Sequence, residues 1–435
     1  MKRLMCVALC VVLLGGTALF AGGTSETAAE APRSFNIISH EVHRRITAGD
    51  GGDIITPWLQ QHPNLTEAAW TTMGIQEIHD RLFREAAARS TELDVAYVLN
   101  PFVTQRASRL LEPLDDFLEQ HPIEGFAENF PAGMRDALSF DGQLYAIPVR
   151  SATHAMSWNQ QIFEERGLTR PPETPQEFEE FARRLTFTRE DGTRVYGYAQ
   201  HSNFYYTSFN SLARMFGGGL ITEDFEVIAD SEGTIQAMEM FHRFYTDEIM
   251  PRETVTWAHA EKQRAMQAGQ VAMAFDVFAR IYNINDPSQT DFGSWRAAPY
   301  PLDPSLRDQM EAASPNTEFW AIAIPRNARD KQTSWDYIRH LSSHDSAVSM
   351  ALNGNGPARL SVFEDSRFQS ATPDWQLLRS LEQHARIPLP GFDRSSEAAE
   401  LIDEYIERGM IGDMEPAAAM RELARELRSL SDELR

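Results

Sequence analysis

Short apolar runs alternate with amphipathic stretches along most of this chain. Residues 35–39 (FNIIS) and 94–99 (DVAYVL) are apolar runs of strand length, and residues 75–88 between them carry apolar side chains at helical spacing. Strands as apolar as these are typical of parallel sheets that are covered on both faces. The pattern therefore predicts a strand–helix–strand unit and an α/β fold.

The order of elements is easiest to follow in residues 141–186. An Asp-Gly turn indicates a β-hairpin, and an apolar run then leads to Trp158 and Asn159. A short helix ends at Gly167, and an amphipathic helix follows a Pro-rich turn. The same reasoning predicts a broken helix at 110–118, helices at 205–215, 231–245, 333–342 and 397–434, and strands at 271–275 and from Trp320.

The N-terminus has the order of a secretory signal. Lys2 and Arg3 precede an apolar run at residues 4–20, and small residues follow at 21–23. We expect cleavage near Gly22. The alternative is a retained membrane anchor, for which the apolar run is at the short end.

Cleavage there would leave a mature chain without cysteine, because Cys6 and Cys10 both lie inside the signal. Neither a disulfide nor a thiol nucleophile would then be available. Residues 23–34 lack apolar periodicity and are predicted to form a disordered tether.

Length and charge bound the function further. At 435 residues the chain is longer than one hydrophobic core usually serves, which predicts two domains. The formal net charge is −23, from 40 basic and 63 acidic residues. Such a charge repels nucleic acid and anionic lipid, is unfavourable for anionic ligands, and suits a soluble monomer.

Several motifs, in order along the chain, are similar to those of the family 1 extracellular solute-binding proteins of ABC importers. They include the crossover segment at 141–186, MQAGQVAMAFD ending at Asp276, WAIAIP from Trp320, and GNGPARL ending at Leu360. Residues 47–72 fit the family pattern poorly, and Ser157-Trp158 stands where members often carry two aromatic residues. These departures leave the identity of the ligand open.

The resemblance implies a type II periplasmic-binding-protein-like fold of two α/β lobes, each with a central sheet flanked by helices. A hinge of several segments, near Val149, Arg296 and Gly356, would join the lobes. The protein would bind a small carbohydrate or polyol between them in the periplasm and deliver it to ABC permease subunits. The implied division is a signal peptide at 1–22, a tether at 23–34, lobe 1 at 35–149 and 297–355, and lobe 2 at 150–296 and 356–435.

A sugar site needs flat aromatic faces for C–H surfaces and planar polar side chains for hydroxyl groups. Matching the family motifs residue by residue implies a set of ligand-binding positions at strand ends and crossings. We expect mutation of Asp276 or Asn100 to weaken binding while barely changing the stability of the unliganded protein. The predicted ligand-binding residues are His40, Glu41, Tyr97, Asn100, Trp158, Tyr206, Asn210, Trp257, Asp276, Trp320 and Arg359.

Two alternatives stay open: a secreted carbohydrate-active hydrolase, and a binding protein for a non-sugar solute. Against the hydrolase, Glu164-Glu165 and Glu179-Glu180 are adjacent on helices, where neighbouring side chains point in different directions. Residues 40–43 (HEVH) lack the spacing of a zinc helix, and no G-x-S-x-G motif is present. We therefore predict no catalytic residue, no metal and no cofactor.

Overall fold

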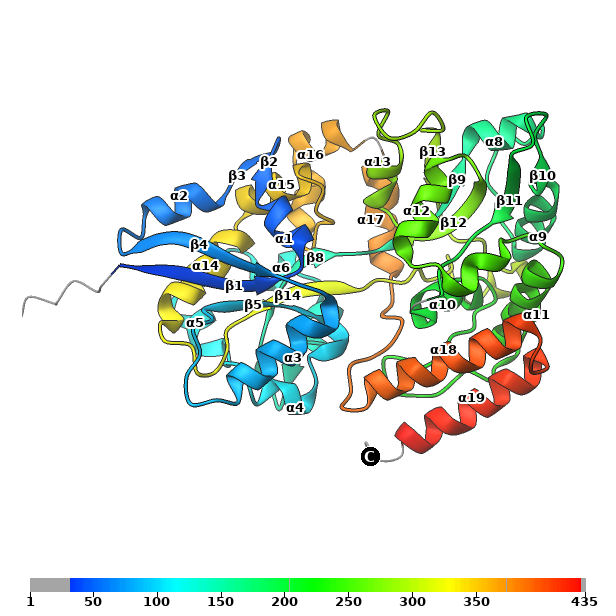
Figure 1. Ribbon diagram of the computed structural model, residues 1–435. Coiled ribbons are helices and arrows are strands. Elements are labelled where there is room, and N and C mark those ends of the chain that lie inside the picture. Colours follow the sequence, from blue (N-terminus) through cyan, green and yellow to red (C-terminus); the bar gives the residue numbers. More distant parts are fainter. Residues whose placement is uncertain (1–31, 203, 373, 432–435) are drawn as a thin grey trace, which may run out of the picture.

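The computed structural model describes residues 32–202, 204–372 and 374–431, and it shows two α/β lobes (Figure 1). Each lobe contains a five-stranded sheet flanked by helices, as the sequence predicted. The predicted signal peptide, and the tether up to residue 31, lie outside the described residues. Within the described part of the chain, no helix has both the length and the apolarity needed to cross a bilayer.

The sheet of lobe 1 has the order β4-β1-β5-β14-β8. The apolar runs predicted as strands lie at its centre, where β5 and β14 are buried along their whole length. Strands β4, β1 and β5 are parallel, and β14 runs antiparallel to both β5 and β8. The strands are β1 (Arg33–Ser39), β4 (Leu65–Thr72), β5 (Val95–Leu99), β8 (Ile147–Ser151) and β14 (Phe319–Ala323).

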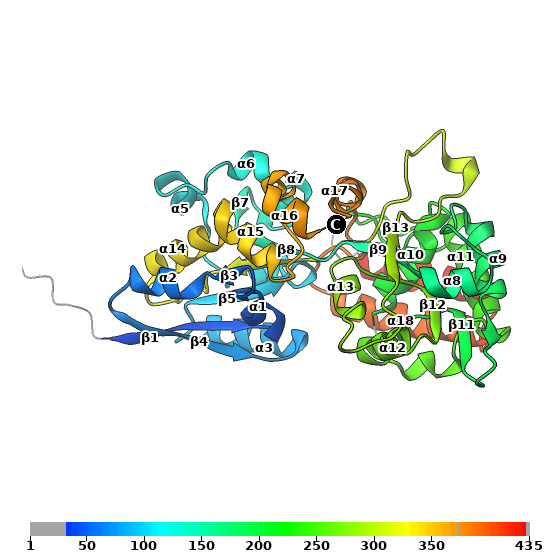
Figure 2. The ribbon, with the colours of Figure 1, turned by 90° about the horizontal axis from the view of Figure 1, so that it is seen from above.

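Helices cover both faces of this sheet (Figures 1 and 2). The predicted broken helix is a helix only from Asp115, because Leu111 forms a β-bridge with Pro325 and Pro113 precedes the first turn. The helices of this lobe are α1 (Glu41–Ile46), α2 (Ile55–Gln60), α3 (Ile75–Ala86), α4 (Gln105–Ser108), α5 (Asp115–Gln120), α6 (Phe126–Asn129), α7 (Ala132–Asp136), α14 (Lys331–Ser342) and α15 (His344–Leu352).

Strand β4 is an element that the sequence pattern did not predict. It lies in the divergent segment 47–72, together with the small hairpin β2 (Ala48–Gly49) and β3 (Gly52–Asp53). Only Leu65 of its eight residues is buried, so the strand has no apolar run. As an edge strand it is held mainly by parallel pairing with β1, a contact that no local pattern reveals.

The sheet of lobe 2 has the order β10-β11-β12-β9-β13. Helices α10, α11, α18 and α19 pack together on this lobe, with aromatic and Met side chains of α10 and α11 inside (Figure 1). The strands are β9 (His154–Asn159), β10 (Phe187–Thr188), β11 (Arg194–Tyr198), β12 (Val271–Val277) and β13 (Trp295–Ala298), and the helices are α8 (Gln160–Glu165), α9 (Pro175–Arg184), α10 (Tyr205–Met215), α11 (Glu232–Thr246), α12 (His259–Gln267), α13 (Arg280–Ile284), α18 (Ser395–Ile411) and α19 (Pro416–Ser431).

The connections between the lobes are hydrogen-bonded to one another. Where β8 leads into β9, Ala152 N–H donates to Glu318 O at 2.7 Å and His154 N–H donates to Asn316 O at 2.8 Å. On the other side of this returning segment, Thr317 N–H donates to Arg386 O at 2.9 Å. The segment at 315–318 therefore lies between the other two connections.

Side-chain packing shows where each connection begins. The sequence placed the return to lobe 1 near Arg296, but Tyr300, Leu302 and Ala313 still pack in the core of lobe 2.

After α15, the helices α16 (Ser366–Ala371) and α17 (Trp375–His384) share a separate apolar cluster with α15. Helix α17 lies between the lobes in both views (Figures 1 and 2). The predicted lobe limits stay a prediction.

The connection from β8 to β9 passes close to the segment that follows α15, and there is no room for a side chain at Gly356 where they meet. Ser151 N–H donates to Gly356 O at 2.9 Å. A Cβ atom at Gly356 would lie 2.0 Å from the carbonyl oxygen of Ser151, far inside van der Waals contact. Gly356→Ala should lower the free energy of unfolding by about 1–3 kcal/mol or more, as overpacking does.

Gly133→Ala is the matched control, because a Cβ atom at this exposed position in α7 would meet nothing within 4 Å. It should be neutral or stabilising by about 0.5–1 kcal/mol, since helical Gly loses more entropy than Ala on folding. Urea unfolding of both variants measures the difference. Equal stability of the two variants would show that the crossing relaxes without cost.

A carboxyl group also lies at this crossing. Ser151 Oγ donates to Glu382 Oε1 of α17 at 2.8 Å, beside the hydroxyl groups of Thr153 and Thr317. Burial raises the pKa of Glu382 to about 7, although the bonds from the hydroxyl groups oppose the shift. The folded state thus favours the protonated acid.

The pH dependence of stability follows from the sign of this shift. The pKa of Glu382 in the folded protein lies above its ordinary value of 4.5. The contribution of this group to the free energy of unfolding is therefore largest below pH 4.5 and is lost as pH rises through about 7. Glu382→Gln should therefore raise the melting temperature at pH 8 and change it little at pH 5. Glu180→Gln, at an exposed position on α9, is the control. A constant difference between Glu382→Gln and wild type across this range would contradict the prediction.

Candidate functional site

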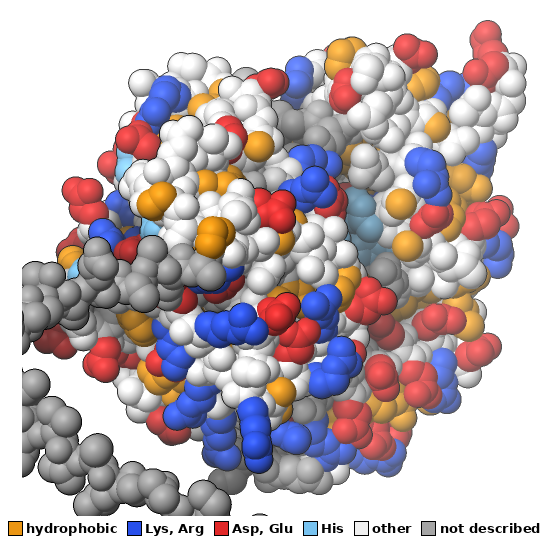
Figure 3. All heavy atoms as spheres, turned by 60° about the vertical axis from the view of Figure 1, so that its left-hand side comes forward, with side chains coloured by type: hydrophobic (Ala, Val, Ile, Leu, Met, Phe, Trp, Pro, Cys, Tyr) orange, Lys and Arg blue, Asp and Glu red, His pale blue; other side chains and the backbone are white. Residues whose placement is uncertain are grey.

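A cavity of about 500 Å³ lies between the two lobes. Its size is in the range of small-molecule sites in proteins. In Figure 3, histidine side chains lie in the hollow between the two halves of the molecule. The cavity is lined by His40, Val42, Arg45, Ile75, Leu99, Arg150, Ala152, His154, His201, Phe204, Tyr206, Thr207, His259, Gln263, Val277, Ala279, Arg280, Gln289, Glu318, Trp320 and Gly354.

Lobe 1 contributes the ends of its strands. His40 directly follows β1, and Leu99 ends β5, so the carboxyl ends of two parallel strands open into the cavity. Ligands of open α/β sheets bind at this edge. His40 caps α1, because its Nδ1 accepts a hydrogen bond from Val42 N–H at 3.3 Å. Trp320, from antiparallel β14, reaches the same edge at its N-terminal side.

Lobe 2 contributes three histidines and the start of α10. Burial lowers the pKa of His154 to about 3 and that of His201 well below its ordinary range. It also lowers the pKa of His259, although Asp276 opposes the shift. These side chains are therefore neutral at pH 7 and can both donate and accept hydrogen bonds. Nδ1 of His154 and of His201 is buried with no hydrogen-bond partner in the described structure.

Asp276 holds two cavity residues in place from behind. Its carboxylate forms ion pairs with Lys262 at 3.1 Å and with Arg280 at 3.0 Å, and it lies 3.4 Å from His259 Nε2. The positive charges around it hold the pKa of Asp276 well below its ordinary range against the effect of burial. Lys262 and His259 lie three residues apart on α12, and Arg280 begins α13. The carboxylate of Asp276, on β12, therefore joins both helices to this strand.

Glu318 reaches the cavity from the connection that returns to lobe 1. Tyr206 of α10 donates its hydroxyl hydrogen to Glu318 Oε1 at 3.1 Å. Burial raises the pKa of Glu318, while Tyr206, Arg280 and Arg150 oppose the shift. Among the described residues that line the cavity, Glu318 is the only carboxylate.

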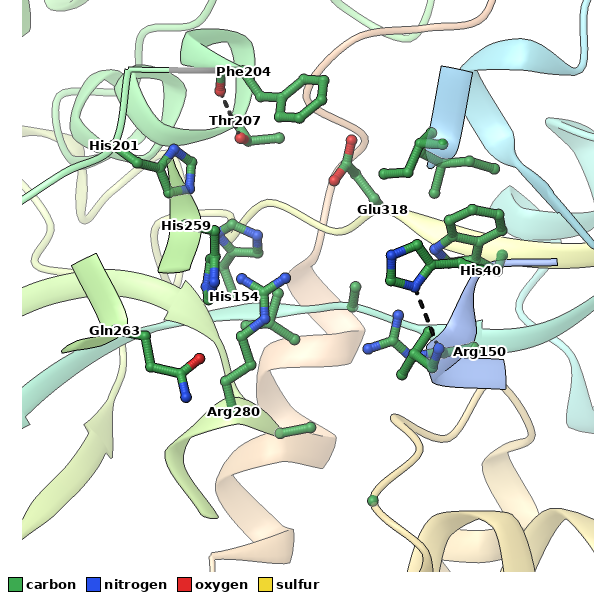
Figure 4. Close-up of a pocket in the computed structure, with 18 of the residues that line it drawn as sticks. His40, Arg150, His154, His201, Phe204, Thr207, His259, Gln263, Arg280 and Glu318 are labelled. Atoms are coloured by element: carbon green, nitrogen blue, oxygen red, sulfur yellow. Dashed lines mark hydrogen bonds between the residues drawn. The ribbon is translucent and has the colours of Figure 1, made fainter. Parts of the chain in front are cut away.

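The side chains of Arg280 and Arg150 extend into the cavity from opposite lobes (Figure 4). Arg280 is paired with Asp276. Arg150 differs: its Nε is buried without a hydrogen-bond partner, and no ion pair joins it to a carboxylate of the described residues. Burial, together with the charges of Arg280 and Arg45, lowers the pKa of Arg150 to about 10, so the guanidinium stays charged at pH 7.

Three of the residues predicted from sequence, His40, Tyr206 and Trp320, line the cavity. Asp276 lies behind it, and the remaining residues lie elsewhere. Tyr97 stacks on His43 in the lobe 1 core, with ring centroids 4.3 Å apart. Asn100 Oδ1 accepts from Phe319 N–H at 3.0 Å.

Most of the other residues predicted from sequence pack or form hydrogen bonds away from the cavity. Trp158 packs edge-to-face on Phe163, and Asn210 Nδ2 donates to Pro388 O. Arg359 donates to the carbonyl oxygens of Ser342 and Glu124, away from the cavity. Trp257 packs beside the core of lobe 2, and Glu41 is exposed on α1. Ligand contact by any of these predicted residues stays a prediction.

The residues predicted from sequence did not include Arg150, Arg280, Glu318 or the lobe 2 histidines. Two features of the sequence could have indicated them: Arg150 lies near the end of an apolar strand at the crossover, and Arg280 follows Asp276 by four residues. Nothing local marks His154 or His201, which reach the cavity through the pairing of β9 and the approach to α10. No group of three or more His, Cys, Asp or Glu residues suited to a metal ion occurs in the described ranges.

From sequence, mutation of Asp276 was expected to barely change the stability of the unliganded protein. The ion pairs of Asp276 predict a large loss of stability instead. Asp276→Ala would leave Lys262 charged and fully buried, so we now expect a loss of about 3–5 kcal/mol in the free energy of unfolding. The double variant Asp276→Ala/Lys262→Met should recover much of this loss, because the uncompensated charge is removed. Urea unfolding tests both. A single variant as stable as wild type would contradict the assigned pairing.

Comparison with known proteins gives a consistent answer. The sequence model of the bacterial extracellular solute-binding protein family matches residues 54–375. A maltotriose-binding protein of Pyrococcus abyssi is 24% identical over 265 residues, 60% of this chain and 53% of that protein. An erythritol/L-threitol-binding protein of Mycolicibacterium smegmatis is 23% identical over 271 residues, 57% of this chain and 54% of that protein. The chain thus spans about half the length of these two relatives.

The fold is also found among solved structures. Maltose-bound MalE3 of T. maritima matches with a TM-score of 0.76 at 20% identity, covering 92% of this chain and 100% of that one. The predicted type II periplasmic-binding-protein-like fold is confirmed. Since the family model covers most of the sequence, the chain belongs to the family of bacterial extracellular solute-binding proteins.

Proposed function

We propose that this protein captures a small carbohydrate or polyol between its lobes, outside the cytoplasm, and delivers it to an ABC permease. The observation that carries the proposal is the cavity itself, which both lobes line and the connections between them cross. The family membership and the sugar- and polyol-binding relatives support the same ligand class.

The chemistry of the lining supports this ligand class. Trp320, Phe204 and Tyr206 offer aromatic faces to C–H surfaces. Neutral histidines, Gln263 and arginines offer hydrogen bonds to hydroxyl groups, which must be paired when buried. We propose that these side chains, with His40, contact the ligand, and that Asp276 positions Arg280 and His259.

The mechanism is closure of the lobes around the ligand. A ligand that contacts both walls binds the closed form more tightly than the open form, and this difference shifts the population toward closure. The hydrogen-bonded connections at 151–154, 315–318 and 386 would act as the hinge. The closed form would be the one that the permease recognises.

The lining also argues against the alternative of a hydrolase. Glycoside hydrolysis commonly uses two carboxyl groups on either side of the scissile bond. Glu318 is the only carboxylate among the described lining residues, and Asp276 is held behind the wall by Lys262 and Arg280. We therefore propose that the protein releases its ligand unchanged.

A ligand screen tests the proposal. Thermal-shift measurements against neutral sugars, polyols and their acidic derivatives should identify a ligand, since one present at about 100 times its dissociation constant adds about 2.7 kcal/mol. Small-angle scattering should then show a smaller radius of gyration with that ligand, and the recovered ligand should be intact. Binding without compaction would contradict the closure mechanism, and product formed in proportion to protein would favour the hydrolase.

A further inference from the structure

The charges that line the cavity are not balanced. Arg45, Arg150 and Arg280 face a single described carboxylate, that of Glu318. Behind the wall, Lys262 and Asp276 add one charge of each sign. The excess of positive charge stands out because the chain as a whole carries a formal net charge of −23.

Neither of the nearby acids forms an ion pair with Arg150 in the described part of the chain, although the charge of Glu318 partly opposes the lowering of the pKa of Arg150. Asp276 is surrounded by Lys262, Arg280 and His259. Glu318 accepts its hydrogen bond from Tyr206 and forms no ion pair with a described residue. A charged group that is partly removed from water costs free energy unless it is paired, so Arg150, which has no ion pair with a described residue, is held at a cost to stability.

From these observations we propose that the ligand is an acidic sugar or polyol whose anionic group, a carboxylate or a phosphate ester, pairs with Arg150 and Arg280. The guanidinium group presents donors in a fork that matches either anion. The arginines extend from opposite lobes, so the anion would join the two walls (Figure 4). This inference rests on the proposed function and narrows its ligand class.

The rest of the ligand would lie against the neutral part of the wall. His154 and His201 each carry a buried Nδ1 without a partner among the described residues, and both line the cavity. Neutral imidazoles suit hydroxyl groups, which donate and accept. The overall negative charge of the protein, which alone is unfavourable for anionic ligands, acts at long range and is screened by salt, whereas the arginines contact the ligand directly.

Matched ligand pairs test the inference by isothermal titration calorimetry. D-gluconate is compared with D-glucitol, D-glucuronate with D-glucose, and D-glucose 6-phosphate with D-glucose. We expect at least one acidic member to bind about 10- to 100-fold more tightly than its neutral partner, as charge-assisted hydrogen bonds allow. The carboxylate and phosphate arms identify which anion is preferred. The preference should shrink at higher salt.

Variants assign the preference to the arginines. Arg150→Gln should reduce the preference at least 10-fold, while Arg150→Lys should keep part of it. Arg296→Gln, at an exposed position of β13 outside the cavity lining, should leave it unchanged. Without ligand, Arg150→Gln should melt at the same or a higher temperature than wild type, because it removes a partly buried charge that forms no ion pair with a described residue. This second readout also shows that the variant is folded.

The outcomes separate this inference from the proposed function. If neutral sugars or polyols bind and no acidic member binds more tightly than its neutral partner, the acidic-ligand inference fails and the proposed function stands. Equal loss of affinity for both members in Arg150→Gln would mean that Arg150 instead pairs with Glu318 on closure, which also overturns the inference. If no neutral or acidic member of the panel binds, both the inference and the proposed function fail.

Discussion

The architecture depends on three connections that are hydrogen-bonded to one another between the lobes. Ala152 and His154 bond to the segment at 315–318, which in turn bonds to Arg386. Gly356 makes this possible, because any larger residue would collide with the backbone at Ser151. A bundle of extended segments bends more easily than two packed lobes deform, so motion is expected at this crossing. The cavity lies beside these connections, since Ala152, His154 and Glu318 line it.

The second constraint is electrostatic. Asp276 gathers Lys262, Arg280 and His259 around one buried carboxylate and so turns the end of β12 into a rigid wall. On the facing wall, no carboxylate among the described residues forms an ion pair with Arg150. A binding protein gains affinity when its polar groups are already in place, because less ordering is needed on binding. In the proposed mode of binding, an anionic group of the ligand would stabilise the charge of Arg150.

Many elements were predictable because their signals are local. The apolar runs at β1, β5, β12 and β14 and the capped helices α9 and α11 lie within a few residues of the predicted limits. Strand β4 was missed because an edge strand needs no apolar run, and the helix predicted at 110–118 begins only at Asp115. Tyr300 and Ala313 still pack in the core of lobe 2 after Arg296, and such packing cannot be read from periodicity.

The sequence by itself determined the α/β class from its hydrophobic pattern and the resemblance to solute-binding proteins from its motifs. It also placed His40 just after one strand and Trp320 near the start of another. Only the tertiary structure decided which polar residues meet. Tyr97, Asn100 and Trp158 also lie on or next to predicted strands, yet their side chains are used inside the lobes. Arg150, Arg280 and Glu318 come together from three distant segments. The net charge of a cavity depends on residues from several distant segments, so no local sequence pattern predicts it.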